Sequence, residues 1–125
     1  MAEAITTNNF RQRIAKHFFD GSALPQATQM AFGDGGHVGN TPKPADGNQT
    51  SLVHELLRKP LAAITQEDIY SLTGTGRIEA SDLVGISISE AALLDSAGNV
   101  LGFRNFAPKV KESDETYDIK IKLKF

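Results

Sequence analysis

The sequence contains no cysteine and no tryptophan, and it has only two tyrosines. Without cysteine, disulfide frameworks, thiolate zinc sites and a cysteine nucleophile are all excluded. A glycan- or ligand-binding β-domain would need an exposed aromatic platform or a polar pocket. Most of the seven phenylalanines fall at positions expected to face inward, so such a domain is the alternative and not the first hypothesis.

Long apolar runs and an excess of one charge are also missing. No stretch approaches the roughly 20 apolar residues of a membrane span, and residues 1–7 lack the basic start and apolar run of a secretory signal. The formal net charge of −2 provides no basic field that would recruit nucleic acid or an anionic membrane. We therefore expect a soluble protein that stays in the host cytoplasm until assembly, with no nucleic-acid or membrane partner.

The size and composition are those of one globular domain. The chain has 125 residues, of which 40% are hydrophobic and 22% charged, and this is enough to close a single core. We expect one domain over residues 1–125, with residues 1–6 flexible.

The N-terminal part predicts an amphipathic helix that packs on a larger body. Phe10, Ile14 and Phe18 recur at the spacing of one helical face. Asn9 and Gln12 resemble a capping box, and Gly21 suits a left-handed helix stop.

The next segments predict a strand, a long loop and a second helix. Residues 27–32 alternate as a strand, and residues 33–50 carry glycine, proline and almost nothing apolar. A loop of this length is functional or mobile. Residues 51–57 predict a short helix with Leu52 and Leu56 inward, capped by Ser51 and stopped by Pro60.

The second half of the chain predicts only strands. Residues 61–65 form a short apolar run, and residues 70–79 alternate with glycines at their centre, which indicates a bulge or a close backbone approach. Residues 86–94 and 100–106 flank the turn at 95–99 as a hairpin, residues 108–115 read as a charged loop, and residues 117–125 alternate to the last residue. The fold class is therefore α+β, an antiparallel β-sheet or small β-sandwich preceded by two short helices.

No group of side chains indicates catalysis or a bound cofactor. The Gly33–Gly36 run lacks the lysine and the helix of a nucleotide-binding loop, so we interpret it as a turn. His17, His37 and His54 have no metal-ligand spacing, although the long loop leaves open a site formed by Asp34, His37 and His54. No serine lies in a nucleophile elbow. We expect no enzyme, no cofactor and no metal.

Two charged features of the sequence, the lysines of the last strand and the carboxylate of Glu90, indicate either a structural role or contact with a partner. The lysines at 120, 122 and 124 read as the solvated or edge-guarding face of the last strand, with an acidic protein partner as the alternative. Glu90 falls on the apolar face when counted in twos from Ile88, where a carboxylate is costly unless paired. Arg58 is the expected partner of Glu90, with Glu55 as a competitor.

An ordered set of motifs resembles the N-terminal region of phage tail-collar fibre proteins. The family pattern includes an "AVGDG" strand end, a "TxLxxExxR" helix and an "ISExGLxDxxGNL" hairpin. The corresponding residues lie in the same order between about residues 24 and 111: Met30-Ala31-Phe32-Gly33-Asp34-Gly35, Thr50-Ser51-Leu52 with Glu55 and Arg58, and Ile88-Ser89-Glu90 with Leu93, Asp95, Gly98-Asn99 and Leu101. Ala91-Ala92 departs from the usual valine-glycine, and the region after Asn105 diverges.

The resemblance implies a structural role in a virion. In that family this region attaches a fibre to the baseplate of a contractile tail, typically as a trimer, so the expected partners are other tail or baseplate proteins in a homotrimer or an assembly-dependent oligomer. A tail-like bacteriocin or injection system would fit equally. The sequence ends at Phe125 without a fibre shaft, so receptor recognition is not carried over. The motif residues are expected to determine the fold through positive φ at Gly33, Gly35 and Gly98 and through charges at Asp34, Glu55, Arg58, Glu90 and Asp95.

Overall fold

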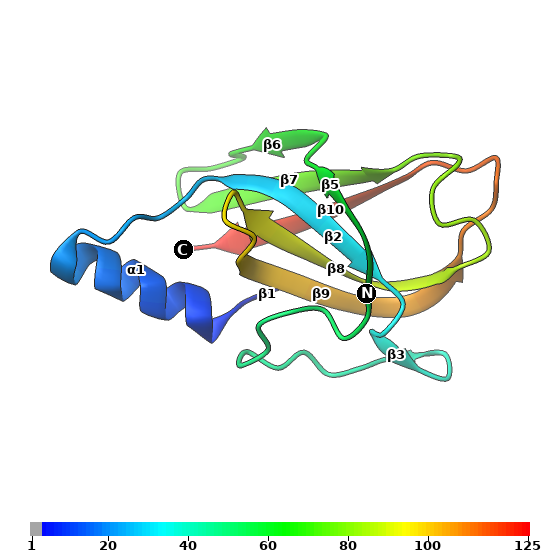
Figure 1. The fold of residues 1–125 in the computed structure, drawn as a ribbon, viewed down its shortest axis with the longest axis horizontal. Coiled ribbons are helices and arrows are strands. Elements are labelled where there is room, and N and C mark those ends of the chain that lie inside the picture. The colour runs from blue at the N-terminus through cyan, green and yellow to red at the C-terminus, as the bar shows by residue number, and fades with distance from the viewer. Residues whose placement is uncertain (1–3) are drawn as a thin grey trace.

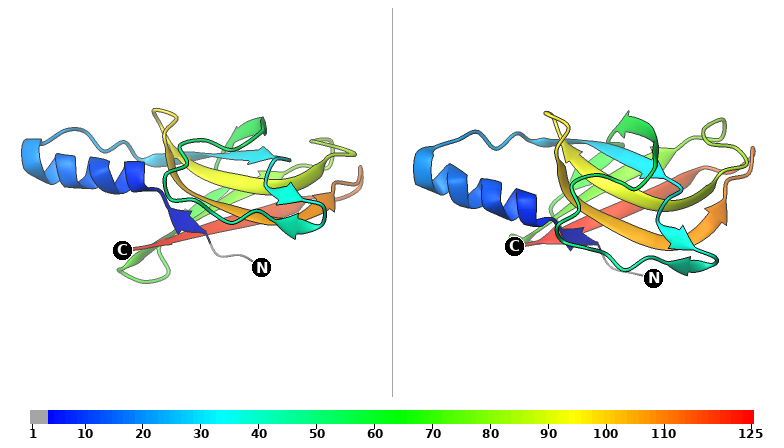
Figure 2. Two further views of the ribbon diagram at one scale, coloured as in Figure 1. Left: turned by 90° about the horizontal axis from the view of Figure 1, so that it is seen from below. Right: turned by 60° about the horizontal axis from the view of Figure 1, so that its bottom comes forward.

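Two antiparallel β-sheets pack face to face, and one helix stands off their side (Figures 1 and 2). The computed structural model describes residues 4–125. One sheet has the order β1-β9-β8-β2-β5 and the other the order β10-β7-β6, while β3 and β4 form a separate hairpin. The elements are β1 (Ile5–Thr6), α1 (Asn8–Asp20), β2 (Ala27–Gly33), β3 (His37–Val38), β4 (Thr41–Pro42), β5 (Glu55–Pro60), β6 (Ala63–Thr65), β7 (Ser71–Ile78), β8 (Ser87–Asp95), β9 (Val100–Val110) and β10 (Tyr117–Lys124). The expected α+β class is confirmed, with one helix instead of two.

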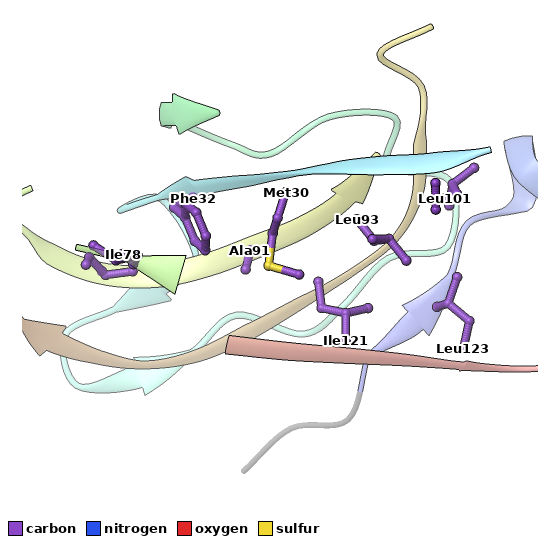
Figure 3. Close-up of a cluster of buried hydrophobic side chains, with 10 residues drawn as sticks. Met30, Phe32, Ile78, Ala91, Leu93, Leu101, Ile121 and Leu123 are labelled. Carbon is purple, nitrogen blue, oxygen red and sulfur yellow. The ribbon is translucent and has the colours of Figure 1, made fainter. Parts of the chain in front are cut away.

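The main core lies between the two sheets. Side chains from β2, β8 and β9 point toward side chains from β7 and β10 (Figure 3). The largest of them are fully buried: Met30, Phe32, Ile78, Leu93, Ile121 and Leu123. A second cluster on the outer face of the five-stranded sheet contains Ala31, Leu52, Ala92, Leu94, Val100 and Phe103. Both faces of β2 and β8 are therefore apolar, which explains their nearly continuous burial.

The glycines at the centre of β7 are places of close approach, as their position in the strand predicted. A Cβ on Gly76 would lie 2.8 Å from Cζ of Phe32, and a Cβ on Gly74 would lie 2.6 Å from Cδ1 of Leu93. The absence of side chains at these two positions lets the sheets pack closely.

The predicted hairpin and last strand are confirmed, but the charged loop begins later than expected. β9 continues through Val110, so residues 108–110 belong to a strand. In this stretch three residues of β8, from Ile88 to Glu90, oppose five residues of β9, from Asn105 to Lys109. Pro108 lies inside this irregular stretch, where a missing N–H costs no regular ladder hydrogen bond.

The second helix was a wrong prediction. Residues 51–54 are irregular, and Glu55–Pro60 form the edge strand β5, which pairs with β2. Leu52 is buried in the second cluster, whereas Leu56 is exposed. The leucine spacing fitted a helix, but pairing with β2, far away in the sequence, determines the conformation.

The N-terminal helix forms where predicted but is capped and packed differently. Thr7 is the N-cap, and its Oγ1 accepts a hydrogen bond from the N–H of Phe10 at 3.2 Å, so the Asn9–Gln12 capping box was wrong. Gly21 ends the helix at φ 77° as expected. None of the helical residues is fully buried. The expected packing of the helix against the rest of the domain is therefore limited to the first turns of the helix.

The flexible start was expected over residues 1–6. Ile5 and Thr6 instead pair with Phe103 and Gly102 of β9, and residues 1–3 lie outside the described part of the chain. Over residues 4–125 there is no helix with the length and apolar character needed to cross a membrane.

Candidate functional site

A buried carboxylate organises one end of the outer face of the five-stranded sheet. Glu90 of β8 is fully buried. Its Oε2 accepts the N–H of Gly35 at 2.7 Å and the N–H of His54 at 2.9 Å, and its Oε1 accepts the N–H of Val53 at 2.8 Å. We call this arrangement the Glu90 cradle. It fastens both ends of the segment between β2 and β5 to the centre of the sheet.

The expected partner of Glu90 was wrong. Arg58 binds Glu55 on the same strand, with Nη2–Oε1 and Nε–Oε2 distances of 2.8 and 3.1 Å. Glu90 was expected to share an apolar face with both Ile88 and Ala92, and this expectation fails for Ile88, while Ala92 lies in the second apolar cluster. The irregular pairing between Ile88 and Glu90 places Ile88 with Ala91 and Leu93 in the main core, so Glu90 points to the opposite side. Backbone donors satisfy its carboxylate there, and no side chain among residues 4–125 forms an ion pair with it.

The glycines that precede the loop are required by the Glu90 cradle. A Cβ on Gly33 would lie 2.6 Å from Oε2 of Glu90, and a Cβ on Gly35 would lie 2.9 Å from the same atom. Neither glycine has the expected positive φ. A Cβ on Gly33 would come closest of all to the carbonyl oxygen of His54, and a Cβ on Gly35 closest to Cβ of Val53. Close approach of the backbone to residues 53–54 and to the carboxylate, and not a left-handed conformation, explains these two positions.

The three side chains of the metal site that the sequence left open, Asp34, His37 and His54, do not come together. Oδ1 of Asp34 lies 2.5 Å from Nδ1 of His54. His37 instead places its Nδ1 2.7 Å from Oγ of Ser89, which also accepts the N–H of Gly36 at 2.9 Å. Among residues 4–125, no three histidine and carboxylate side chains form a group that could hold a metal ion. Ser89 is fully buried, so its hydroxyl is not an accessible nucleophile. Its contact with His37 fastens the loop to β8.

A second buried carboxylate, Asp95, joins the β8–β9 turn to the helix. Its Oδ1 accepts the N–H groups of Ala97 and Asn99, both at 2.9 Å, and its Oδ2 lies 2.7 Å from Nη2 of Arg13. Gly98 completes the turn at φ 86°, as expected. The sequence indicated the turn but not Arg13, because nothing in the local pattern places α1 beside it.

The surroundings of Asp95 favour its ionised form. Burial alone would raise the pKa of this carboxyl, but the N–H of Asn99, the Arg13 guanidinium, the Asn99 amide and the N–H of Ala97 together hold its pKa below 3.8. The ionised carboxylate therefore favours the folded state. Its contribution is present above the unfolded pKa of 3.8 and is lost as the pH falls through the lower folded pKa.

We expect Asp95→Asn to flatten the acid limb of the stability curve. The free energy of unfolding of the unmodified protein should fall as the pH drops from about 5 to about 2, and the variant should lose less over that range. Urea unfolding across this pH range measures the slope. Asp114→Asn, an exposed change in the β9–β10 loop, is the matched control and should leave the slope unchanged. Equal slopes in all three proteins would contradict the role given to Asp95.

The far end of α1 carries the most exposed aromatic side chains in the described residues. Phe18 and Phe19 are 83% and 90% exposed. The first turns of the helix are held to the sandwich by Arg13 on Asp95 and by the edge-on contact of Phe10 with Phe125. The remainder extends beyond the strand ends (Figures 1 and 2). We call Phe18, Phe19 and the helical turn that bears them the α1 tip. Sequence spacing assigned Phe18 to a packed face, and the structure leaves that face uncovered.

Comparison with protein-family models gives a match over most of the chain. The family model described as phage tail-collar fibre protein, N-terminal, matches residues 1–120 of the 125-residue chain. A search of curated proteins finds no match. The matched range includes the Gly33–Gly35 strand end, Glu55, Arg58, Glu90 and the Asp95–Asn99 turn, on which the resemblance was based.

Proposed function

Because the chain belongs to the phage tail-collar fibre protein family, we propose that it anchors or adapts a tail fibre to the baseplate of a phage or phage-like contractile tail. Membership of this family gives it a structural role in the phage tail and a place in the virion tail. The finer role, attachment of a fibre at the baseplate after synthesis in the host cytoplasm, is our proposal. It covers a bacteriocin or an injection system that uses the same tail design.

The observation that supports this role is the α1 tip. Two phenylalanines exposed over four-fifths of their surface or more are costly in water, and such side chains are enriched at the centres of protein interfaces. The tip stands away from the sandwich, so a neighbouring protein can reach it without rearrangement of the domain. We propose that a tail or baseplate neighbour, or another copy in a homotrimer or assembly-dependent oligomer, covers it.

The long loop between residues 33 and 50 is held against the five-stranded sheet by hydrogen bonds. Its backbone and side chains supply partners to Glu90, Ser89 and Asn105. It also covers part of the outer face of the sheet that carries the second apolar cluster. Removal of the loop would therefore disturb the domain itself, and we place the docking contact on the α1 tip.

Loss of the gene tests the proposed function. Particles without this protein should show intact sheaths and baseplates but no attached fibres in negative-stain electron microscopy. Supply of the protein from a plasmid should restore the fibres. Fibres present in normal number on the particles of the null mutant would contradict the proposal.

A further inference from the structure

A groove opens between β9 and β10, where the edges of the two sheets meet. Its volume is about 490 Å³, within the range of roughly 300–1,000 Å³ that is typical of binding pockets. Four of its lining residues give it an apolar and aromatic floor: Ile88, Phe106, Tyr117 and Ile119. Its lining residues come from β8, β9, β10 and the β9–β10 connection, and that connection lies at the opposite end of the sandwich from α1 (Figure 1).

Both strands that border the groove have backbone without a strand neighbour on one side. β10 is the last strand of its sheet. β9 pairs with β1 only at Gly102 and Phe103, so among the described residues its continuation from Arg104 onward has β8 on one side and no paired strand on the other. Unpaired strand edges can hydrogen-bond an extended chain that lies beside them. Because β9 is irregular around Pro108, β10 offers the more regular of the two edges, with the carbonyl of Lys120 already accepting a hydrogen bond from Arg104.

The rim of the groove is positively charged. Nζ of Lys109 lies 4.3 Å from the centre of the Tyr117 ring, and Nη1 of Arg104 donates to the carbonyl of Lys120 at 2.9 Å. Asp118, which also lines the groove, is taken by Arg77 at 2.8 Å. Neither Lys109 nor Lys120 forms an ion pair with a carboxylate within residues 4–125. The floor and rim together therefore complement a ligand that is both apolar and acidic.

We propose that this groove binds an extended acidic segment of a neighbouring tail protein, one in which apolar and acidic residues alternate. An extended chain presents one set of side chains to the floor and offers its backbone to the strand edges. The lysines on the rim attract carboxylates, which also steers the encounter. The chain's net charge of −2 provides no general field for a nucleic acid, so an acidic peptide is the better fit. This inference concerns a surface separate from the α1 tip and goes beyond the proposed function.

Titration of the ¹⁵N-labelled full chain with a synthetic peptide tests this inference. The probe is a peptide of about ten residues that alternates valine and glutamate, long enough to span a typical strand. We expect its addition to shift amide signals in β9 and β10 around Phe106, Tyr117 and Ile119. The affinity should fall as the salt concentration rises, because the rim charges are exposed. A peptide that alternates valine and lysine should produce no such shifts.

Charge reversal on the rim provides the matched comparison. Lys109→Glu combined with Lys120→Glu changes two exposed side chains and should weaken binding of the valine–glutamate peptide by about tenfold or more. Lys16→Glu combined with Lys124→Glu changes the net charge equally at exposed positions outside the lining. That control should bind within about twofold of the unmodified protein.

Several results would overturn the inference. These are no shifts at about 1 mM peptide, where even weak binding is visible, shifts that map outside β9 and β10, and equal binding by the two double variants. A short single-stranded oligonucleotide that bound the groove more tightly than the peptide would also overturn it and identify nucleic acid as the occupant. None of these results depends on α1, so the outcome is separable from that of the proposed function.

Discussion

Replacement of Glu90 by alanine is expected to lower the free energy of unfolding by about 3 kcal/mol, because three backbone N–H groups lose an ionised acceptor at once. These donors belong to Gly35, Val53 and His54, so the loss loosens both ends of the segment that covers the second apolar cluster. Each buried donor left without a partner costs roughly 1–3 kcal/mol. Relief from burying a carboxylate offsets part of this cost.

Urea unfolding followed by circular dichroism measures this effect, since the chain has no tryptophan to report by fluorescence. Glu90→Gln should fall between the unmodified protein and Glu90→Ala, because it keeps one acceptor oxygen but turns an NH₂ group toward the donors. Glu112→Ala, at an exposed position in the β9–β10 loop, should change stability by less than about 0.5 kcal/mol. A loss of less than about 1 kcal/mol for Glu90→Ala would refute the structural role given to the Glu90 cradle.

The double substitution Phe18→Ser and Phe19→Ser is expected to weaken incorporation into tails by about a hundredfold without unfolding the domain. Burial of each phenylalanine in an interface stabilises it by roughly 1.5–3 kcal/mol, and about 3 kcal/mol in total corresponds to about two powers of ten in affinity. Because both side chains are exposed in the isolated chain, their loss removes no contact of the core. The free energy of unfolding should therefore stay within about 0.5 kcal/mol of the original value.

Complementation of the null phage with the variant, followed by quantification of the protein in purified tails, measures this prediction. The matched control is Val38→Ser with Val84→Ser, which removes two exposed apolar side chains elsewhere on the surface. That control should incorporate normally. Normal incorporation of the Phe18/Phe19 variant would show that the α1 tip is not a docking surface.

The strands with strict alternation could be predicted from the sequence alone. The last strand shows this best, since the inward Ile121 and Leu123 alternate with lysines. Strict alternation of apolar and polar residues predicts a strand with one face buried and one face in solvent. The Asp95–Asn99 turn was equally clear, because Gly98 supplies the positive φ that such a turn requires. The ordered family motifs gave the correct family, and the fold class followed from the strand patterns.

The features that the sequence could not reveal depend on contacts between distant segments. Strand β5 was mistaken for a helix because its pairing with β2 leaves no mark on local spacing. Glu90 was recognised as a carboxylate in an apolar setting, but its partners are backbone N–H groups, which every residue except proline possesses. The exposure of Phe18 depends on the direction in which α1 leaves the sheet. A helical apolar stripe predicts a covered face and cannot show that residues 4–125 leave the end of that face uncovered.

The position of this chain in an assembled tail tests the central claim most directly. A cryo-electron microscopy map of purified tails should place the sandwich at the junction of fibre and baseplate, with the side chains of Phe18 and Phe19 buried against a neighbouring subunit. The same map would give the copy number and symmetry. A map that lacks this chain, or that places it away from the fibre junction with α1 in solvent, would contradict its role as a fibre anchor.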